Sequence, residues 1–343
     1  MGGIHGGDIY RNKVNMDFSV NINPLGIPDE VKKVLKGAAD RCLEYPDMEA
    51  SELKSAVSNM LGIPGEYLTF GNGASEIFMG IVHALKPEKT LIPVPSFYGY
   101  EYTTEAASSD IVYFPLKEEN EFLPDEDLLE ALTEDIDMLW FANPNNPTGK
   151  RVETEYLKKL FQVCREKNIY VVLDECFIEF CGSEYSMLPD MEDYAHVLIV
   201  RAFTKIYAIP GVRLGYLVCS NKTLSDRIRK QLPEWNLSVF AQAAGVACTG
   251  QRTYVEKTVE YVKKERKYLT DGLKRFGFHV YNSDTNFILI YSERPLYEML
   301  LQRGILIRDC ANFKGLSKGF YRIAVKQRKD NEKLLEAIGD CIG

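Results

Sequence analysis

Short apolar runs alternate with amphipathic stretches through the middle of the chain. Runs at 90–94, 136–142 and 169–174 predict buried strands, and stretches between the runs, such as 153–167, have the apolar spacing of helices. The alternation extends from about residue 67 to residue 218. It predicts an α/β fold in which a mostly parallel sheet carries helices on both faces.

The pattern differs at both ends of the chain. After residue 235, long helical patterns are followed by short strands, including 304–309 and 320–325, which predicts a small α+β domain. Residues 1–28 are rich in Gly, Asn and Pro and predict an extended arm with one strand at 18–22. We therefore expect three parts, namely an arm at 1–28 that packs with the small domain and the active site, a large domain at 29–235 and a small domain at 236–343.

Composition narrows the class of protein. Apolar residues make up 45% and charged residues 26% of the 343 residues, as is usual for a soluble globular enzyme. The net charge of −8, with acids and bases interspersed, argues against nucleic-acid and membrane partners. Eight cysteines without a CxxC pair and four histidines without ligand spacing predict reduced thiols and no metal site. No signal-peptide core is present, so a cytoplasmic location is expected.

One lysine lies where an amine can become reactive. Lys205 follows the apolar run 196–200 and precedes the Pro210-Gly211 turn. A lysine sheltered at a strand end can be desolvated and lose its proton, which turns it into an amine that captures carbonyl groups. Arg213, eight residues later, is a cation able to hold a phosphate through paired hydrogen bonds. Most lysines near strand ends are surface charges, so the argument depends on the motifs that precede this one.

Four earlier motifs could build a cofactor site around that lysine. The glycine turn 71–76 opens a helix, which exposes backbone amides to a phosphate, although an ordinary capped helix has the same pattern. Phe97 could stack on a flat ring or face the core. Asn146 lies in the rigid turn NPNNPTG and can donate to a ring oxygen. Asp174 is the last residue of a parallel-type strand, and ligands bind at such strand ends in open α/β sheets. The alternative interpretation is that Asp174 caps the following helix.

In this order, the motifs resemble those of the fold-type I pyridoxal-phosphate enzymes, the aspartate aminotransferase superfamily, over nearly the whole chain. The resemblance implies the fold of that superfamily and pyridoxal 5'-phosphate as the cofactor. It implies that Lys205 forms the Schiff base and moves protons, and that Asp174 pairs with the ring nitrogen. The other cofactor-binding positions that it implies are Asn146 at the ring oxygen, Phe97 on the ring face, and Gly73, Ala74, Ser75, Thr204 and Arg213 at or near the phosphate.

The resemblance also concerns the assembly and two unusual positions. Tyr45 resembles the tyrosine that reaches the cofactor phosphate of the other subunit, which implies a homodimer with shared active sites.

Ala202 stands three residues before the lysine, where the family usually has a hydroxyl group on the cofactor phosphate. Phe177 stands where the family often has a tyrosine that bonds the ring oxygen. The loss of that donor should change the electronics of the ring.

Four segments indicate a branch within the superfamily. HGGDIY, DFSVNINPLG, DECFIEF and TKIYAIPGVRLGY resemble segments of threonine-phosphate decarboxylases of cobalamin biosynthesis, although Asp8 stands where those enzymes have asparagine. This resemblance implies decarboxylation of O-phospho-L-threonine to (R)-1-aminopropan-2-yl phosphate. The substrate-binding positions that it implies are His5, Asn23 and Arg308 for the phosphate and Arg322 for the carboxylate.

Two alternatives remain open at this point. The chain also resembles histidinol-phosphate aminotransferases, so amino transfer by this or a related class I/II aminotransferase is the alternative enzyme. A cofactor-binding regulator without turnover is the alternative outside enzymes. It is disfavoured because the lysine is present and the sequence contains no DNA-binding segment.

Overall fold

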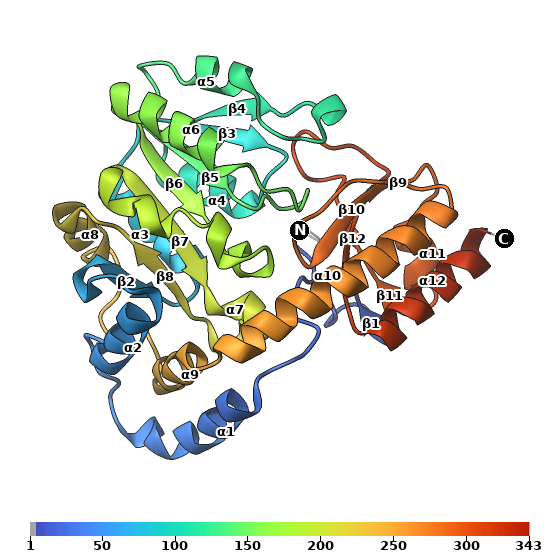
Figure 1. Cartoon of the computed structure of the whole chain (residues 1–343), viewed down its shortest axis with the longest axis horizontal. Coiled ribbons are helices and arrows are strands. Elements are labelled where there is room, and N and C mark those ends of the chain that lie inside the picture. The colour runs from blue at the N-terminus through green and yellow to red at the C-terminus, as the bar shows by residue number, and fades with distance from the viewer. Residues whose placement is uncertain (1–4, 343) are drawn as a thin grey trace.

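The computed structural model describes residues 5–342 and contains two main sheets (Figure 1). Its strands are β1 Met16–Asp17, β2 Leu68–Gly71, β3 Lys89–Val94, β4 Asp110–Pro115, β5 Met138–Ala142, β6 Tyr170–Asp174, β7 Val197–Ala202, β8 Gly215–Val218, β9 His279–Val280, β10 Phe287–Tyr291, β11 Ile305–Leu306, β12 Arg308–Asp309 and β13 Phe320–Ala324. Its α-helices are α1 Asp29–Gly37, α2 Ser51–Leu61, α3 Ala74–Leu85, α4 Tyr98–Ala106, α5 Glu126–Ala131, α6 Thr154–Glu166, α7 Phe203–Ile206, α8 Lys222–Arg229, α9 Val239–Thr249, α10 Arg252–Arg275, α11 Leu296–Leu301 and α12 Arg328–Ile342.

The larger sheet has seven strands in the order β2-β8-β7-β6-β5-β3-β4. Strand β8 is antiparallel to both of its neighbours, and the other described pairings are parallel. Central strands are buried on both faces, as parallel sheets require. In β6, Val171 and Leu173 join one apolar cluster while Val172 joins the cluster on the opposite face. The predicted mostly parallel α/β fold is confirmed.

The C-terminal part is built on a four-stranded antiparallel sheet in the order β12-β13-β10-β9. Helices α10, α11 and α12 lie against this sheet (Figure 1) and share a core with it. Helix α9, however, packs on α1 and α2, and its apolar residues belong to the core of the larger part. We therefore propose that the division between the two parts falls near the start of α10 and not at residue 236.

Two predicted strands differ in the structure. The strand expected at 18–22 is replaced by β1 at Met16–Asp17, because the Asp17 carboxylate accepts hydrogen bonds from Ser19 N at 2.8 Å and Ser19 Oγ at 2.6 Å and turns the chain. The single strand expected at 304–309 is divided. Its first half, β11, pairs with β1, whereas β12 pairs with β13.

The arm is fixed to the C-terminal part by this pairing. Phe18 is fully buried, its N–H donates to Leu306 O at 2.7 Å, and its carbonyl accepts from Ala324 N at 2.9 Å. The first four residues of the predicted arm lie outside the described residues. No helix among residues 5–342 is both long and apolar enough to cross a membrane.

The sheet topology determines where functional side chains can gather. Strands β5, β6 and β7 are parallel neighbours, so their carboxyl ends lie at one edge of the sheet. The turn containing Asn146 follows β5, Asp174 ends β6, and Lys205 follows β7. Strand β13, which carries Arg322, belongs to the smaller sheet on the other side of this edge (Figure 1).

Candidate active site

A cavity of about 360 Å³ lies between the sheet edge, the arm and the smaller sheet. Most of the positions selected from the sequence line it. They are His5, Ala74, Ser75, Phe97, Asn146, Asp174, Thr204, Lys205, Arg213, Arg308 and Arg322. Residues that are far apart in the chain therefore converge on one site, as the order of the strands requires.

Lys205 lies on the short helix α7, directly after β7. Burial, together with the positive charges of Arg322 and Arg213, lowers the pKa of its amine to about 8, although Cys176 and Asp174 act in the opposite direction. With this pKa, about one amine in ten is neutral at pH 7. The amine is therefore far more nucleophilic near neutral pH than an exposed lysine.

Asp174 lies at the buried end of β6 and is held by two donors. Its Oδ1 accepts from Cys176 N at 2.9 Å, and its Oδ2 accepts from the Tyr100 hydroxyl at 2.6 Å. Burial raises the pKa of the carboxyl, and these hydrogen bonds act against that rise. The carboxylate is thus fixed in orientation before any ligand binds.

Tyr100 was missed by sequence reasoning. It follows Phe97 by three residues and is almost fully buried on α4, where an aromatic residue at helical spacing looks like an ordinary core residue. The spacing from Phe97 could have suggested a shared face, but the hydrogen bond to Asp174 spans 74 residues of sequence and needs the folded chain.

The acid next to Asp174 has a structural role. Glu175 is fully buried and accepts from Arg201 Nε at 2.9 Å and Nη2 at 2.7 Å. Ser186 Oγ and Met187 N also donate to its carboxylate, at 2.8 and 2.9 Å. Neither member of this satisfied buried pair lines the cavity, so the two neighbouring acids divide into one cavity residue and one structural residue.

The glycine turn places the N-terminus of α3 beside Arg213. Gly73 has φ +83°, no side chain caps the helix, and Ala74 and Ser75 line the cavity. Arg213 itself has φ +61° and donates from Nη1 to Pro210 O at 3.1 Å. A Cβ on Gly73 would collide with Arg213 Nη2, so the guanidinium can occupy its present position because residue 73 is glycine. Backbone amides and a cation together form a site suited to a phosphate.

We predict that Gly73→Ala weakens binding of a phosphate-bearing cofactor by about tenfold, because the guanidinium must move away. Gly62→Ala is the control, since Gly62 has a similar φ of +68° but no atom within 4 Å of the added Cβ. The two backbones differ in ψ, which is +166° at Gly73 and +31° at Gly62, so Gly73→Ala also carries the larger backbone strain, about 1–3 kcal/mol. Titration of the two apoproteins with cofactor should give a weaker affinity for Gly73→Ala than for Gly62→Ala. Equal affinities would contradict the proposal that the glycine turn and Arg213 hold the cofactor phosphate.

Arg322 is buried in β13 and reaches across to the larger sheet. Its Nη2 donates to Ser19 O at 2.7 Å, and its Nη1 donates to Asn146 Oδ1. Its Nε has no hydrogen-bond partner in the described part of the chain. Burial lowers the pKa of the guanidinium to about 10, so it stays charged at neutral pH. Because Arg322 engages Oδ1 of Asn146, that amide has its Nδ2 donor to offer to a ligand.

Further cationic groups lie at the same end of the cavity. Arg308 is the register partner of Arg322 in the next strand, is buried, and donates from Nη2 to Asn312 Oδ1 at 2.7 Å. The His5 ring lies 5.8 Å from the Phe97 ring, and its pKa is lowered by burial and by both arginines. A concentration of positive charge of this kind favours anionic ligands.

The prediction for Asn23 needs correction. Its side chain is turned into the protein, where Nδ2 donates to Ile206 O at 2.6 Å and to Thr258 Oγ1 at 2.8 Å, and Oδ1 accepts from Leu25 N. Asn21 lines the cavity instead, is only 3% exposed, and has an Oδ1 atom without a hydrogen-bond partner among the described residues. We therefore propose Asn21, which lines the cavity, for the polar contact expected from this segment.

Comparison with known proteins decides the family. The family model for aminotransferase class I and II matches residues 13–338. A threonine-phosphate decarboxylase of Salmonella typhimurium is 35% identical, covering 95% of this chain and 91% of the relative. The chain belongs to the aminotransferase class I and II family. A second relative, a protein of Caldanaerobacter subterraneus named as a putative threonine-phosphate decarboxylase, is 37% identical over 97% of this chain and 92% of its own length.

A solved structure supports the same family. The histidinol-phosphate aminotransferase of Clostridium acetobutylicum superimposes with a TM-score of 0.89 at 34% identity, covering 95% of this chain and 98% of that one. Enzymes of the aminotransferase class I and II family use pyridoxal 5'-phosphate, and this chain is a pyridoxal-phosphate-dependent enzyme. The resemblance of its motifs to fold-type I enzymes is confirmed.

The residues present fit the cofactor of the aminotransferase class I and II family. The cavity contains an amine with a pKa of about 8 and an oriented carboxylate, and beside it Gly73 leaves the space that the Arg213 guanidinium occupies. The positive charges of Arg213, Arg308 and Arg322 exceed the single negative charge of Asp174 in the lining. An anionic aldehyde with a basic ring nitrogen matches this donor set.

The two departures from the usual family pattern also lie in the cavity. Ala202 and Phe177 both line it, so neither position offers a hydroxyl group to the cofactor. The Phe177 ring packs edge-on against Phe287 with 5.1 Å between ring centroids. Arg322 lies over the other ring of this pair at 5.4 Å from the Phe287 centroid. Phe177 therefore packs against the same aromatic ring that lies beside the Arg322 guanidinium.

Proposed function

We propose that this enzyme decarboxylates O-phospho-L-threonine to (R)-1-aminopropan-2-yl phosphate. The observation that carries the proposal is the pair Arg308 and Arg322, which are both buried and are register partners in adjacent strands facing one cavity. Two such cations suit a substrate with two anionic groups. O-phospho-L-threonine has a phosphate and a carboxylate, whereas histidinol phosphate has only the phosphate. Relatives named threonine-phosphate decarboxylase, at 35% and 37% identity, support the same reaction.

The proposed roles on the cofactor side follow the positions in the cavity. Pyridoxal 5'-phosphate supplies an electron-withdrawing ring that stabilises negative charge on the α carbon of a bound amino acid. We assign Lys205 to covalent capture of the cofactor and to proton transfer at the α carbon. Asp174 holds the ring nitrogen, Asn146 the ring oxygen, and Phe97 the ring face. The phosphate is assigned to Gly73, Ala74, Ser75, Thr204 and Arg213.

The proposed substrate contacts use the arm and the smaller sheet. Arg322 binds the carboxylate that leaves as CO2, and its contacts to Ser19 and Asn146 fix the direction of its guanidinium. Arg308, His5 and Asn21 bind the phosphate. Holding the substrate at both ends fixes which bond at the α carbon is activated, and such positioning can govern rate by orders of magnitude. Lys205 then returns one proton to the carbon that has lost CO2.

We further propose a cytoplasmic homodimer in which Tyr45 completes the site of the partner subunit. Tyr45 is 85% exposed, lies outside the cavity of its own chain, and has its ring 5.4 Å from that of the exposed Trp235. Leu43 and Met48 add exposed apolar surface beside it. Mixing Tyr45→Ala and Lys205→Ala subunits should restore about a quarter to a half of wild-type activity if each site draws on two chains. If the mixed subunits sedimented as a dimer but regained no activity, this role of Tyr45 would be contradicted.

The alternative reaction is amino transfer by a histidinol-phosphate or related aminotransferase, which the similarity to the Clostridium acetobutylicum enzyme favours. A substrate panel separates the two. The enzyme is incubated with O-phospho-L-threonine alone and, separately, with histidinol phosphate and 2-oxoglutarate. We expect many turnovers to aminopropanol phosphate in the first mixture and little glutamate in the second. The reverse pattern would assign the chain to the aminotransferases.

A further inference from the structure

Tyr100 makes a buried contact with Asp174 and has no assigned role toward the cofactor or the substrate. It is 1% exposed, and its hydroxyl donates to Asp174 Oδ2 at 2.6 Å. This length is that of a hydrogen bond to a charged acceptor. The tyrosine belongs to α4 and the aspartate to β6, so the contact links the helix after Phe97 to the centre of the sheet.

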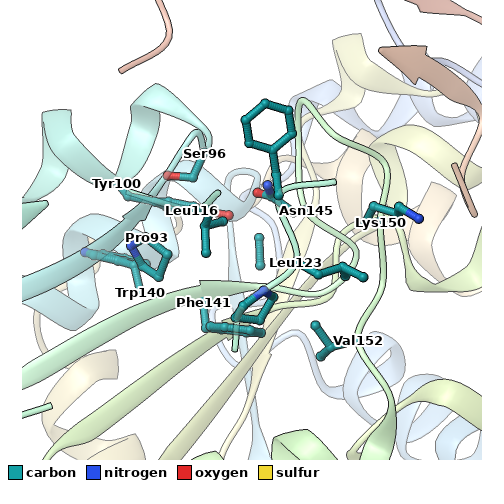
Figure 2. A pocket seen from close by; sticks show the side chains of 13 residues that line it. Pro93, Ser96, Tyr100, Leu116, Leu123, Trp140, Phe141, Asn145, Lys150 and Val152 are labelled. Atoms are coloured by element: carbon teal, nitrogen blue, oxygen red, sulfur yellow. The ribbon is translucent and has the colours of Figure 1, made fainter. Parts of the chain in front are cut away.

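Neighbouring aromatic side chains fix the position of the Tyr100 ring. It stacks on Trp140 with 4.9 Å between ring centroids and an interplanar angle of 10°, and it meets Phe78 edge-on at 5.6 Å. Trp140 Nε1 donates to Thr104 Oγ1 at 2.9 Å, and this hydroxyl in turn donates to Tyr100 O at 2.7 Å. Figure 2 shows Tyr100 and Trp140 together among the side chains that line a second, smaller pocket. The hydroxyl therefore has little freedom to turn away from Asp174.

The surroundings of Asp174 show why a second donor matters. Burial disfavours the charged carboxylate, and the charge of Glu175 adds to this effect. The groups that favour the charged form are Cys176, Tyr100 and the Lys205 amine. Cys176 N and Tyr100 each bond a different oxygen, which fixes the plane of the carboxylate. Without Tyr100, only one side of the carboxylate would be held.

We propose that Tyr100 is a positioning residue for the cofactor: its hydroxyl keeps Asp174 ionised and aimed, so that the ring nitrogen and not Asp174 retains the shared proton. A protonated ring nitrogen makes the ring a stronger acceptor of electrons. The inference rests on the dependence on pyridoxal phosphate and on the proposed role of Asp174. It does not depend on whether the substrate loses CO2 or exchanges its amino group.

The first test removes only the hydroxyl. Tyr100→Phe retains the ring that stacks on Trp140, and Tyr102→Phe, on the same helix but 57% exposed, is the control. Each holoenzyme is loaded with cofactor labelled with ¹⁵N in the ring, and the ¹⁵N chemical shift is followed against pH. In Tyr100→Phe we expect the ring nitrogen to lose its proton roughly one to two pH units lower than in wild type. The control should titrate like wild type, and an unshifted Tyr100→Phe would overturn the proposal.

A second test distinguishes positioning from simple packing. The apoproteins are titrated with pyridoxal phosphate and with its 1-deaza analogue, which has carbon in place of the ring nitrogen. We expect Tyr100→Phe to weaken binding of pyridoxal phosphate by about tenfold and to leave binding of the analogue within twofold of wild type. If Tyr100→Phe lost the same affinity for both ligands, Tyr100 would contribute only through packing, which would contradict the proposal.

A third variant covers the case in which Tyr100→Phe does not fold. Tyrosine at position 100 is replaced by 3,5-difluorotyrosine, which keeps the shape and the hydroxyl but is a more acidic donor. A stronger hydrogen bond to Asp174 should move the pH at which the ring nitrogen loses its proton upward, opposite to the shift expected for Tyr100→Phe. A shift in the same direction as Tyr100→Phe, or none, would contradict the proposal.

Discussion

Replacing Lys205 with alanine is expected to lower kcat by about 10³-fold or more and to abolish the visible absorption that the covalently captured cofactor gives. Proton transfer by a positioned side chain alone contributes about 10²–10⁴-fold, and covalent capture of the aldehyde is lost as well. Among the described residues that line the cavity, no second lysine could replace it. The variant should fold, because it removes a buried amine whose pKa is already lowered by desolvation.

The same amine predicts a pH dependence. Since burial lowers the pKa of Lys205 to about 8, its neutral form is fully present above this pH and is lost as pH falls through it. The rate at which the apoprotein captures pyridoxal phosphate should therefore rise up to about pH 8 and then level off. An exposed lysine would give a rate still rising toward pH 10. Lys222→Ala, at the exposed start of α8, is the control and should behave like wild type.

Arg322→Lys is expected to lower kcat/KM by about 10²-fold, although the positive charge remains. The planar guanidinium donates to Ser19 O and to Asn146 Oδ1 at the same time, and an ammonium group cannot make both contacts in this geometry. A carboxylate held by a point charge is less well oriented, and a misplacement of about 1 Å costs rate on this scale. Steady-state kinetics on the purified variant measures the loss.

Arg303→Lys provides the matched control for this substitution. Arg303 is exposed and donates to the backbone oxygens Met299 O and Asp340 O. Its replacement should change kcat/KM by less than about twofold, as surface substitutions usually do. If Arg322→Lys were as mild as the control, the carboxylate would have to be bound elsewhere, and Arg308 would be the next candidate to examine.

The sequence allowed much of the larger sheet to be predicted, because its strands are apolar on both faces and are separated by helices. Lys205, Asp174 and Asn146 each follow or end such a strand, so their approach to one edge follows from parallel topology. The positions chosen from these motifs do lie together in the cavity. Their individual roles remain predictions that the variants above address.

The missed features all depend on contacts between distant segments. Asn21 and Asn23 are two residues apart in the arm, so an extended chain would place both on the same side. Only the hydrogen bonds of Asn23 to Ile206 and Thr258 show that Asn23 turns away from the cavity. Similarly, β11 and β12 read as one continuous strand, but they pair with different partners. Tyr100 looked like a core residue, which it is, and only its hydroxyl reaches the site.

The central claim, that the enzyme removes the carboxylate of a phosphorylated amino acid, is tested most directly with O-phospho-L-threonine labelled with ¹³C in its carboxylate and supplied in D2O without a keto acid. We predict that every molecule consumed releases one ¹³CO2 and yields aminopropanol phosphate with one deuterium on the carbon that lost CO2. Retention of ¹³C in the organic product, or conversion of substrate only after a keto acid is added, would contradict this account.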